Sequence, residues 1–94
     1  MSKTVTKKIL PNDFRDVLDG YKTFELRKDE NDIQPGDTLI LKEWNPAEKS
    51  FTGLQVEKQV SYVLRKCPEY GLMYGYCIIG FVNDSVDLEK EVPA

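Results

Sequence analysis

The sequence predicts a small α+β domain that is mainly β, with about five to six strands and one short helix after the first strand. Two observations predict this class. Apolar and polar residues alternate in several runs along the chain, which is typical of strands with one buried face. One helical spacing of apolar residues, at Phe14, Val17 and Leu18, follows the first of these runs. With 94 residues, the chain has room for a single domain with one small core.

The first strand is predicted at residues 5–10, and the helix begins directly after it at Pro11. Proline is favoured at a helix start because its missing N–H would have no partner there. We expect Asn12 or Asp13 to cap the helix, and Gly20 to end it in the left-handed conformation. The helix is expected to cover the sheet with its apolar face.

The segment 20–28 is predicted to form the central strand of the site. Because side chains on a strand alternate, Phe24 and Leu26 share one of its faces. The other face carries Tyr21, Thr23, Glu25 and Arg27. Alternation places Lys22 with Phe24, so we expect Gly20 to rotate the chain and bring Lys22 to the charged side. Two interpretations remain open: a polar ligand cleft, or an ordinary solvated ion pair on a half-exposed strand.

The second half of the chain contains the remaining predicted strands. We expect strands at residues 38–44 and 76–82 and a long strand at residues 55–66, after a turn within residues 51–54. The loop 67–75 is rich in Tyr and Gly, and Tyr70 and Tyr74 can stack on a nucleic-acid base or cover a core edge. We expect the domain to span residues 1–83, with an acidic, flexible tail at residues 84–94.

Two further residues at the end of the strand 38–44 have alternative roles. Trp44 can stack on a base at a cleft rim, but we favour a place in the core because a Trp supplies much buried area. Glu43 lies on the other side of that strand, where it is a candidate cleft carboxylate or a solvated edge residue.

Composition narrows the function. The net charge of −3 argues against holding long nucleic acid by its backbone, which needs many Lys or Arg contacts. The chain has no histidine, which excludes Ser-His and Cys-His catalysis, and its two cysteines are too few for a metal site. We therefore expect no metal and no cofactor. With a polar N-terminus and no long apolar run, we expect a cytoplasmic protein without a membrane contact.

The run Gly20-x-Lys22-Thr23-x-Glu25-x-Arg27, followed by a Gly36-Asp37 strand opening and by Glu43-Trp44, resembles the ASCH domains of the PUA-like superfamily. The similarity is greatest to the small bacterial and phage proteins of the DUF3850 group, and it covers residues 5–82. The resemblance implies a PUA-like β-barrel with a cleft beside its first helix. It also implies that the motif residues line this cleft and bind RNA or a nucleotide-like ligand.

Two classes of function follow from this resemblance. In a binding module, Lys22 and Arg27 meet phosphate or base edges, Glu25 accepts from a base amino group, and Tyr70 or Tyr74 stacks. The alternative is a small amidohydrolase acting on an acetylated cytidine, with Lys22, Thr23 and Glu25 as the candidate catalytic residues.

The residues favour binding over catalysis. The related hydrolases carry a threonine three residues after the lysine, where this chain has Glu25; Thr23 is only one residue after Lys22. A carboxylate beside Lys22 holds it protonated, which suits anion binding better than nucleophilic attack. The oligomeric state and the identity of the ligand are left open by the sequence.

Overall fold

The computed structural model describes residues 2–82, so the predicted acidic tail at residues 84–94 lies outside the described part of the chain. The described elements are β1 (Thr4–Ile9), α1 (Pro11–Leu18), β2 (Phe24–Lys28), β3 (Thr38–Asn45), β4 (Ser50–Arg65), the 3₁₀ helix η1 (Pro68–Tyr70) and β5 (Tyr76–Phe81). The prediction of a mainly-β α+β domain with one short helix after the first strand is confirmed.

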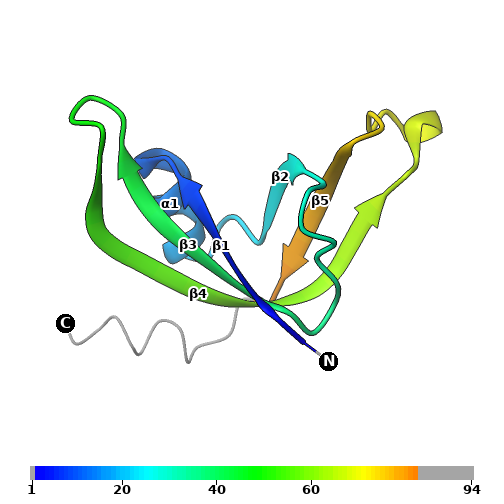
Figure 1. Cartoon of the computed structure of the whole chain (residues 1–94), viewed down its shortest axis with the longest axis horizontal. Coiled ribbons are helices and arrows are strands. Elements are labelled where there is room, and N and C mark those ends of the chain that lie inside the picture. The colour runs from blue at the N-terminus through cyan, green and yellow to red at the C-terminus, as the bar shows by residue number, and fades with distance from the viewer. Residues whose placement is uncertain (1, 83–94) are drawn as a thin grey trace.

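The five strands form one mixed sheet with the order β1-β3-β4-β5-β2. β1 pairs in parallel with β3, and all other pairs are antiparallel. The 16-residue strand β4 belongs to both halves, since its first part pairs with β3 and its last part with β5. Figure 1 shows the result, two arms that diverge from a common base. The strand pairing gives an open sheet with β1 and β2 at its edges.

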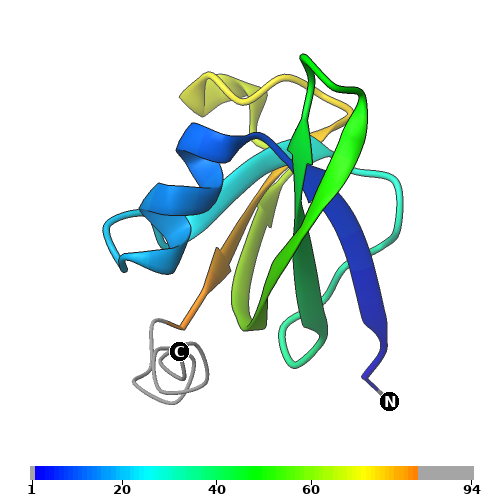
Figure 2. The same cartoon turned by 90° about the vertical axis from the view of Figure 1, so that its left-hand side faces the viewer.

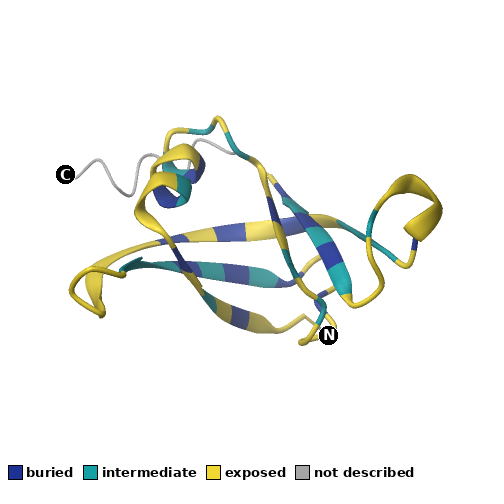
Figure 3. Cartoon of the chain, turned by 90° about the horizontal axis from the view of Figure 1, so that it is seen from above, coloured by how far each residue is buried: buried dark blue, intermediate teal, exposed yellow. Residues whose placement is uncertain are grey.

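One hydrophobic core fills the inner side of the sheet. Phe14 and Val17 of α1 pack against the inner side of β3, where Leu39 and Leu41 are almost fully buried (Figures 1 and 2). Figure 3 shows buried residues alternating along the strands, as a sheet with one covered face requires. The remaining buried members of the core are Val5, Ile9, Ile33, Val56, Val60, Cys77, Ile79 and Phe81.

The start of α1 differs from the expectation. Leu10 is the N-cap residue, and no side chain caps the helix. Pro11 occupies the first helical position, so Asn12 and Asp13 lie within the first turn and neither serves as the cap. This leaves the Asp13 carboxylate available for another partner, which is Lys22.

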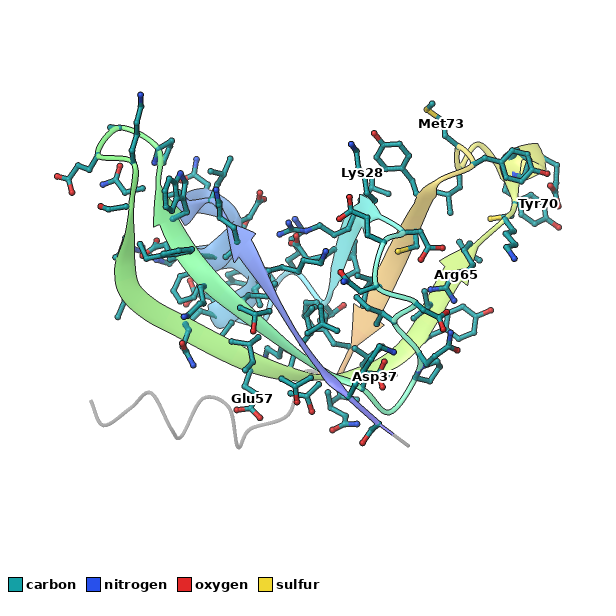
Figure 4. All side chains as sticks on the ribbon, in the orientation of Figure 1. Lys28, Asp37, Glu57, Arg65, Tyr70 and Met73 are labelled. Carbon is teal, nitrogen blue, oxygen red and sulfur yellow. The ribbon has the colours of Figure 1, made fainter. Side chains whose placement is uncertain are left out.

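Asp37 fixes the turn before β3 to the N-terminus. Its carboxylate is 2% exposed and accepts hydrogen bonds from the Lys3 backbone N–H (3.0 Å), the Lys3 ammonium (2.8 Å) and the Gln34 N–H (2.8 Å). The Lys3 ammonium, together with the two backbone N–H groups, lowers the pKa of Asp37 to about 2. Figure 4 labels this residue at the base where the arms meet.

The low pKa of Asp37 predicts an acid-sensitive contribution to stability. An unfolded aspartate titrates near pH 4, so the contribution is complete above about pH 4 and is lost as the pH falls through about 2. Denaturant titrations at several pH values are expected to show Asp37→Asn less stable than the wild type at pH 7, with a gap that narrows below about pH 4. A gap that stays constant down to pH 2 would contradict this role.

Candidate functional site

The chain leaves α1 through a glycine turn that sets the position of Lys22. Gly20 has φ +87°, and its N–H donates to the Val17 carbonyl at 3.1 Å. The N–H groups of Tyr21 and Lys22 both donate to the Asp16 carbonyl at 3.0 Å. This is a Schellman-type helix end, in which a left-handed residue is favourable only for glycine or asparagine. The turn sends the chain back along the helix, as we expected of Gly20.

The strand β2 turns its charged face inward. Glu25 is 4% exposed, whereas Phe24 and Leu26 are 46% and 56% exposed. Glu25 lies opposite the fully buried Ile79 in the β2–β5 register. The predicted alternation is confirmed for residues 24–28, where the side that enters the protein bears the carboxylate and the guanidinium. It is wrong for residues 20–23, which are not strand, because the helix-end turn occupies them and leaves Tyr21 and Thr23 exposed.

Four ionisable side chains meet on this inner side: Asp13, Lys22, Glu25 and Arg27, which we call the Glu25 cluster. Glu25 Oε1 accepts from Arg27 Nε at 3.0 Å and lies 2.9 Å from an Arg27 terminal nitrogen. Glu25 Oε2 lies 3.0 Å from Lys22 Nζ as an ion pair, outside hydrogen-bond geometry. Lys22 Nζ also donates to Asp13 Oδ1 at 3.2 Å. A nearly buried carboxylate therefore lies between two cations.

Exposure differs within the cluster. The side chains of Lys22 and Arg27 are each 23% exposed, that of Glu25 only 5%, and that of Asp13 47%. A ligand approaching from solvent therefore meets the two cations and Asp13 before Glu25. The two positive and two negative charges of the cluster balance. An anion therefore binds only when it replaces Asp13 as a partner of Lys22.

Lys22 is held in its charged form. Partial burial lowers the pKa of Lys22, but the contacts with Glu25 and Asp13 outweigh burial and raise the pKa above its ordinary value. A lysine in this state is a hydrogen-bond donor to anions and not a nucleophile.

Arg27 also links the two edges of the sheet. Its terminal nitrogen donates to the backbone carbonyl of Lys8 in β1 at 2.7 Å. Since β1 and β2 are the outermost strands, this side chain joins the two arms next to the Glu25 cluster. A second contact joins β1 to the turn after β2, the ion pair of Lys7 with Glu30 at 3.7 Å.

Other predicted site residues lie apart from the Glu25 cluster. Thr23 is exposed, and its backbone carbonyl accepts from the Phe81 N–H at 3.0 Å. Glu43 accepts a hydrogen bond from the Thr52 hydroxyl at 2.8 Å. Tyr70 and Tyr74 are 82% and 71% exposed in the loop between β4 and β5. Figure 4 shows Tyr70 and Met73 at the outer end of the right-hand arm, away from α1.

Trp44 is not part of the buried core, contrary to the role we favoured. It is partly exposed, with its ring 4.9 Å from that of Phe51 in an edge-to-face arrangement. The Lys8 ammonium lies 4.0 Å from the centre of the Trp44 ring. The residue lies near the end of β3, where residues 42–45 are all only partly buried.

The sequence did not predict two contacts of the Glu25 cluster, one made by the Asp13 side chain and one by the Lys8 backbone carbonyl. Asp13 was assigned to a helix cap, although a Schellman turn returns the chain along the helix and so brings Lys22 toward it. Lys8 contributes a backbone carbonyl, which no side-chain pattern reveals.

Residues 2–82 contain neither a candidate metal site nor a candidate membrane-spanning helix. No cluster of three or more Cys, Asp or Glu residues there is arranged to hold a metal ion. No described helix has the length and apolar character that crossing a membrane requires. The two cysteines, Cys67 and Cys77, are both buried free thiols.

Comparison with known families identifies the chain. The family model described as "Domain of unknown function (DUF3850)" matches residues 5–81, which include all five strands apart from the first residue of β1. The chain belongs to the DUF3850 family. A relative of this DUF3850 protein is the "Uncharacterized 12.9 kDa protein in GpA 3'region" of Escherichia phage P2, 40% identical over 63 residues. The match covers 67% of this chain and 56% of the phage protein, so the chain spans little more than half of that relative.

Proposed function

We propose that this DUF3850 protein binds a nucleotide, either free or as one unit of a single-stranded RNA, at the Glu25 cluster. The carrying observation is the burial of Glu25, which is 4% exposed between two cations that are each 23% exposed. The likeness of the Gly-x-Lys-x-x-Glu-x-Arg motif to ASCH domains of the PUA-like superfamily supports the same ligand class. In that superfamily the corresponding sheet is a closed barrel, and here Arg27 spans the two sheet edges.

Stability alone is a weak explanation for this arrangement. Replacing a buried ion pair by apolar residues of similar volume is often neutral or stabilising, because desolvation offsets much of the attraction. β2 has two apolar residues, Phe24 and Leu26, and exposes both of them while Glu25 is buried. A strand selected only for stability would be expected to bury the apolar pair.

The proposed roles follow from exposure. Lys22 and Arg27 contact the ligand, because their side chains are partly exposed and carry N–H donors for phosphate groups and base edges. Glu25 is a positioning residue, because it is the buried partner of both cations. Asp13 competes with the ligand for Lys22, since it is the more exposed of the two carboxylates that Lys22 contacts.

Opposite effects of two substitutions test this assignment. Lys22→Gln is expected to weaken binding about tenfold or more, as loss of a charge-assisted hydrogen bond of about 1.5–3 kcal/mol requires. Asp13→Asn is expected to strengthen binding, because it frees Lys22 for the anion. Fluorescence anisotropy with a labelled ten-nucleotide RNA, together with calorimetry on the 5′-mononucleotides, measures both changes.

The matched control is Lys28→Gln. Lys28 is exposed on the outer face of β2. Its replacement by Gln changes the net charge by the same amount as Lys22→Gln does. Equal effects of the Lys22 and Lys28 substitutions would mean that only overall charge matters, and would reject the Glu25 cluster as the binding site.

The amidohydrolase alternative predicts a different result. Because the pKa of Lys22 is raised, its amine is protonated and unable to attack a carbonyl near neutral pH. We therefore expect no hydrolysis of an acetylated cytidine by the wild-type protein, measured by chromatographic separation of substrate and product. Turnover that disappears in a folded Lys22→Ala variant would overturn the binding-only assignment.

A further inference from the structure

A second group of cations and aromatic rings lies where β1 and β3 approach the β3–β4 hairpin. It consists of Lys8, Lys42, Trp44 and Phe51, which we call the Trp44 platform. Lys8 and Lys42 are direct partners in the parallel β1–β3 register, and Trp44 is the partner of Phe51 across the hairpin. Figure 1 shows this hairpin at the end of the left-hand arm, opposite the loop that follows β4.

Each cation of the platform lies over an aromatic ring. Lys8 Nζ is 4.0 Å from the centre of the Trp44 ring, and Lys42 Nζ is 5.6 Å from that of Phe51. The two rings meet edge to face, 4.9 Å apart and at 77°. Phe51 is 50% exposed. The platform therefore presents aromatic surface and positive charge to solvent together.

The charge of the platform is not balanced locally. Among residues 2–82, no carboxylate forms an ion pair with Lys8 or Lys42. Glu43, between Lys42 and Trp44 in sequence, accepts a hydrogen bond from Thr52 instead. Two like charges side by side on neighbouring strands are unfavourable unless an anion joins them. In the Glu25 cluster, by contrast, carboxylates and cations are equal in number.

The two groups are adjacent through a single residue. The backbone carbonyl of Lys8 accepts from Arg27, while the side chain of the same residue covers the Trp44 ring. Arg27 and Trp44 therefore contact the same residue of β1, which lies at an edge of the sheet.

We propose that the Trp44 platform binds the neighbouring nucleotide of a single-stranded RNA held at the Glu25 cluster, so this inference rests on the proposed function. The phosphate draws the ammonium groups of Lys8 and Lys42 together and away from the rings. The exposed aromatic surface then stacks on the base, the mode by which many proteins hold single strands without reading their sequence.

Trp44 makes the platform directly observable, because it is the only tryptophan in the chain. Titration of the full chain with a ten-nucleotide single-stranded RNA is expected to quench or shift its fluorescence, while a mononucleotide bound at the Glu25 cluster leaves it unchanged. The double variant Lys8→Gln/Lys42→Gln is expected to weaken RNA binding at least tenfold. The single variant Lys42→Gln, whose residue makes no contact with the Glu25 cluster, is expected to weaken RNA binding while its affinity for mononucleotides stays that of the wild type.

Salt dependence and an aromatic variant give independent readouts. In the Lys8→Gln/Lys42→Gln variant, loss of the one phosphate that both lysines contact is expected to lower the slope of log affinity against log salt by about 0.7, the value per phosphate for single strands. Phe51→Leu keeps an apolar side chain without a ring and is expected to weaken RNA binding about fivefold or more. The control is Lys28→Gln/Lys66→Gln, which removes two exposed charges from the other arm.

The outcomes separate the two proposals. One outcome rejects the platform and leaves the Glu25 cluster as the binding site. In it, Lys22→Gln weakens RNA binding, the Trp44 fluorescence stays constant, and Lys8→Gln/Lys42→Gln has the same affinity as the control variant. If the platform variants weaken RNA binding and Lys22→Gln does not, the Glu25 cluster is rejected as the nucleotide site. Mononucleotide binding without any RNA binding rejects the platform alone, and absence of both kinds of binding rejects both.

Discussion

Replacing Glu25 by alanine is expected to lower the free energy of unfolding by about 3 kcal/mol. This value is the lower end of the range for removing one partner of a buried ion pair. The side chain is 5% exposed, and its removal leaves Lys22 and Arg27 without their shared counterion. Both cations keep some contact with water, which is why we expect the lower end of the range.

Urea unfolding of the wild type and of Glu25→Ala measures this loss. The matched control is Glu57→Ala, which removes an exposed glutamate of β4 and is expected to change stability by less than about 0.5 kcal/mol. Equal changes in the free energy of unfolding for the two substitutions would contradict the role of Glu25 as the buried counterion of Lys22 and Arg27.

Replacing the whole ion network by apolar residues is expected to separate stability from binding. In the triple variant Lys22→Met, Glu25→Leu, Arg27→Met, no buried charge is left without a partner, so stability is expected to be unchanged or to rise by about 1–4 kcal/mol. Asp13 is 47% exposed and is solvated without Lys22. Binding of the ten-nucleotide RNA is expected to fall about 100-fold, because two charge-assisted contacts of about 1.5 kcal/mol each disappear.

The triple variant is assayed by urea unfolding and by anisotropy on the same preparation. Loss of more than about 3 kcal/mol of stability would mean that the cluster is maintained for the fold, since apolar replacements of a pair that serves only function are tolerated. Wild-type affinity in the triple variant would place the ligand elsewhere.

The helix and the two faces of β2 could be read from the sequence because both depend on local patterns. The spacing of Phe14 and Val17 gave the buried side of α1, and Gly20 gave its end. Alternation grouped Glu25 with Arg27. Alternation does not tell which face is buried, and only the pairing with Ile79 of β5 shows that the charged face points inward.

Features set by distant pairing were not accessible from local pattern. A turn was expected within residues 51–54, but these residues lie inside the continuous strand β4, where Gly53 has φ +97°. β4 and β5 carry the loop with Tyr70 and Tyr74 to the end of one arm, so aromatic content alone did not locate it. Trp44 was assigned to the core from its size, but it lies in the last part of β3, residues 42–45, in which no residue is buried.

The most direct test of the proposed function is to locate a bound nucleotide by NMR. The titration follows the Nε–H signal of Arg27 and the backbone amides of residues 20–27 in ¹⁵N-labelled protein as cytidine 5′-monophosphate is added. We expect saturable shifts centred on Lys22 and Arg27, because their partly exposed side chains are the proposed contacts. Saturable shifts centred elsewhere with an unmoved Arg27 Nε–H signal, or no shifts with any of the four mononucleotides, would contradict the proposal.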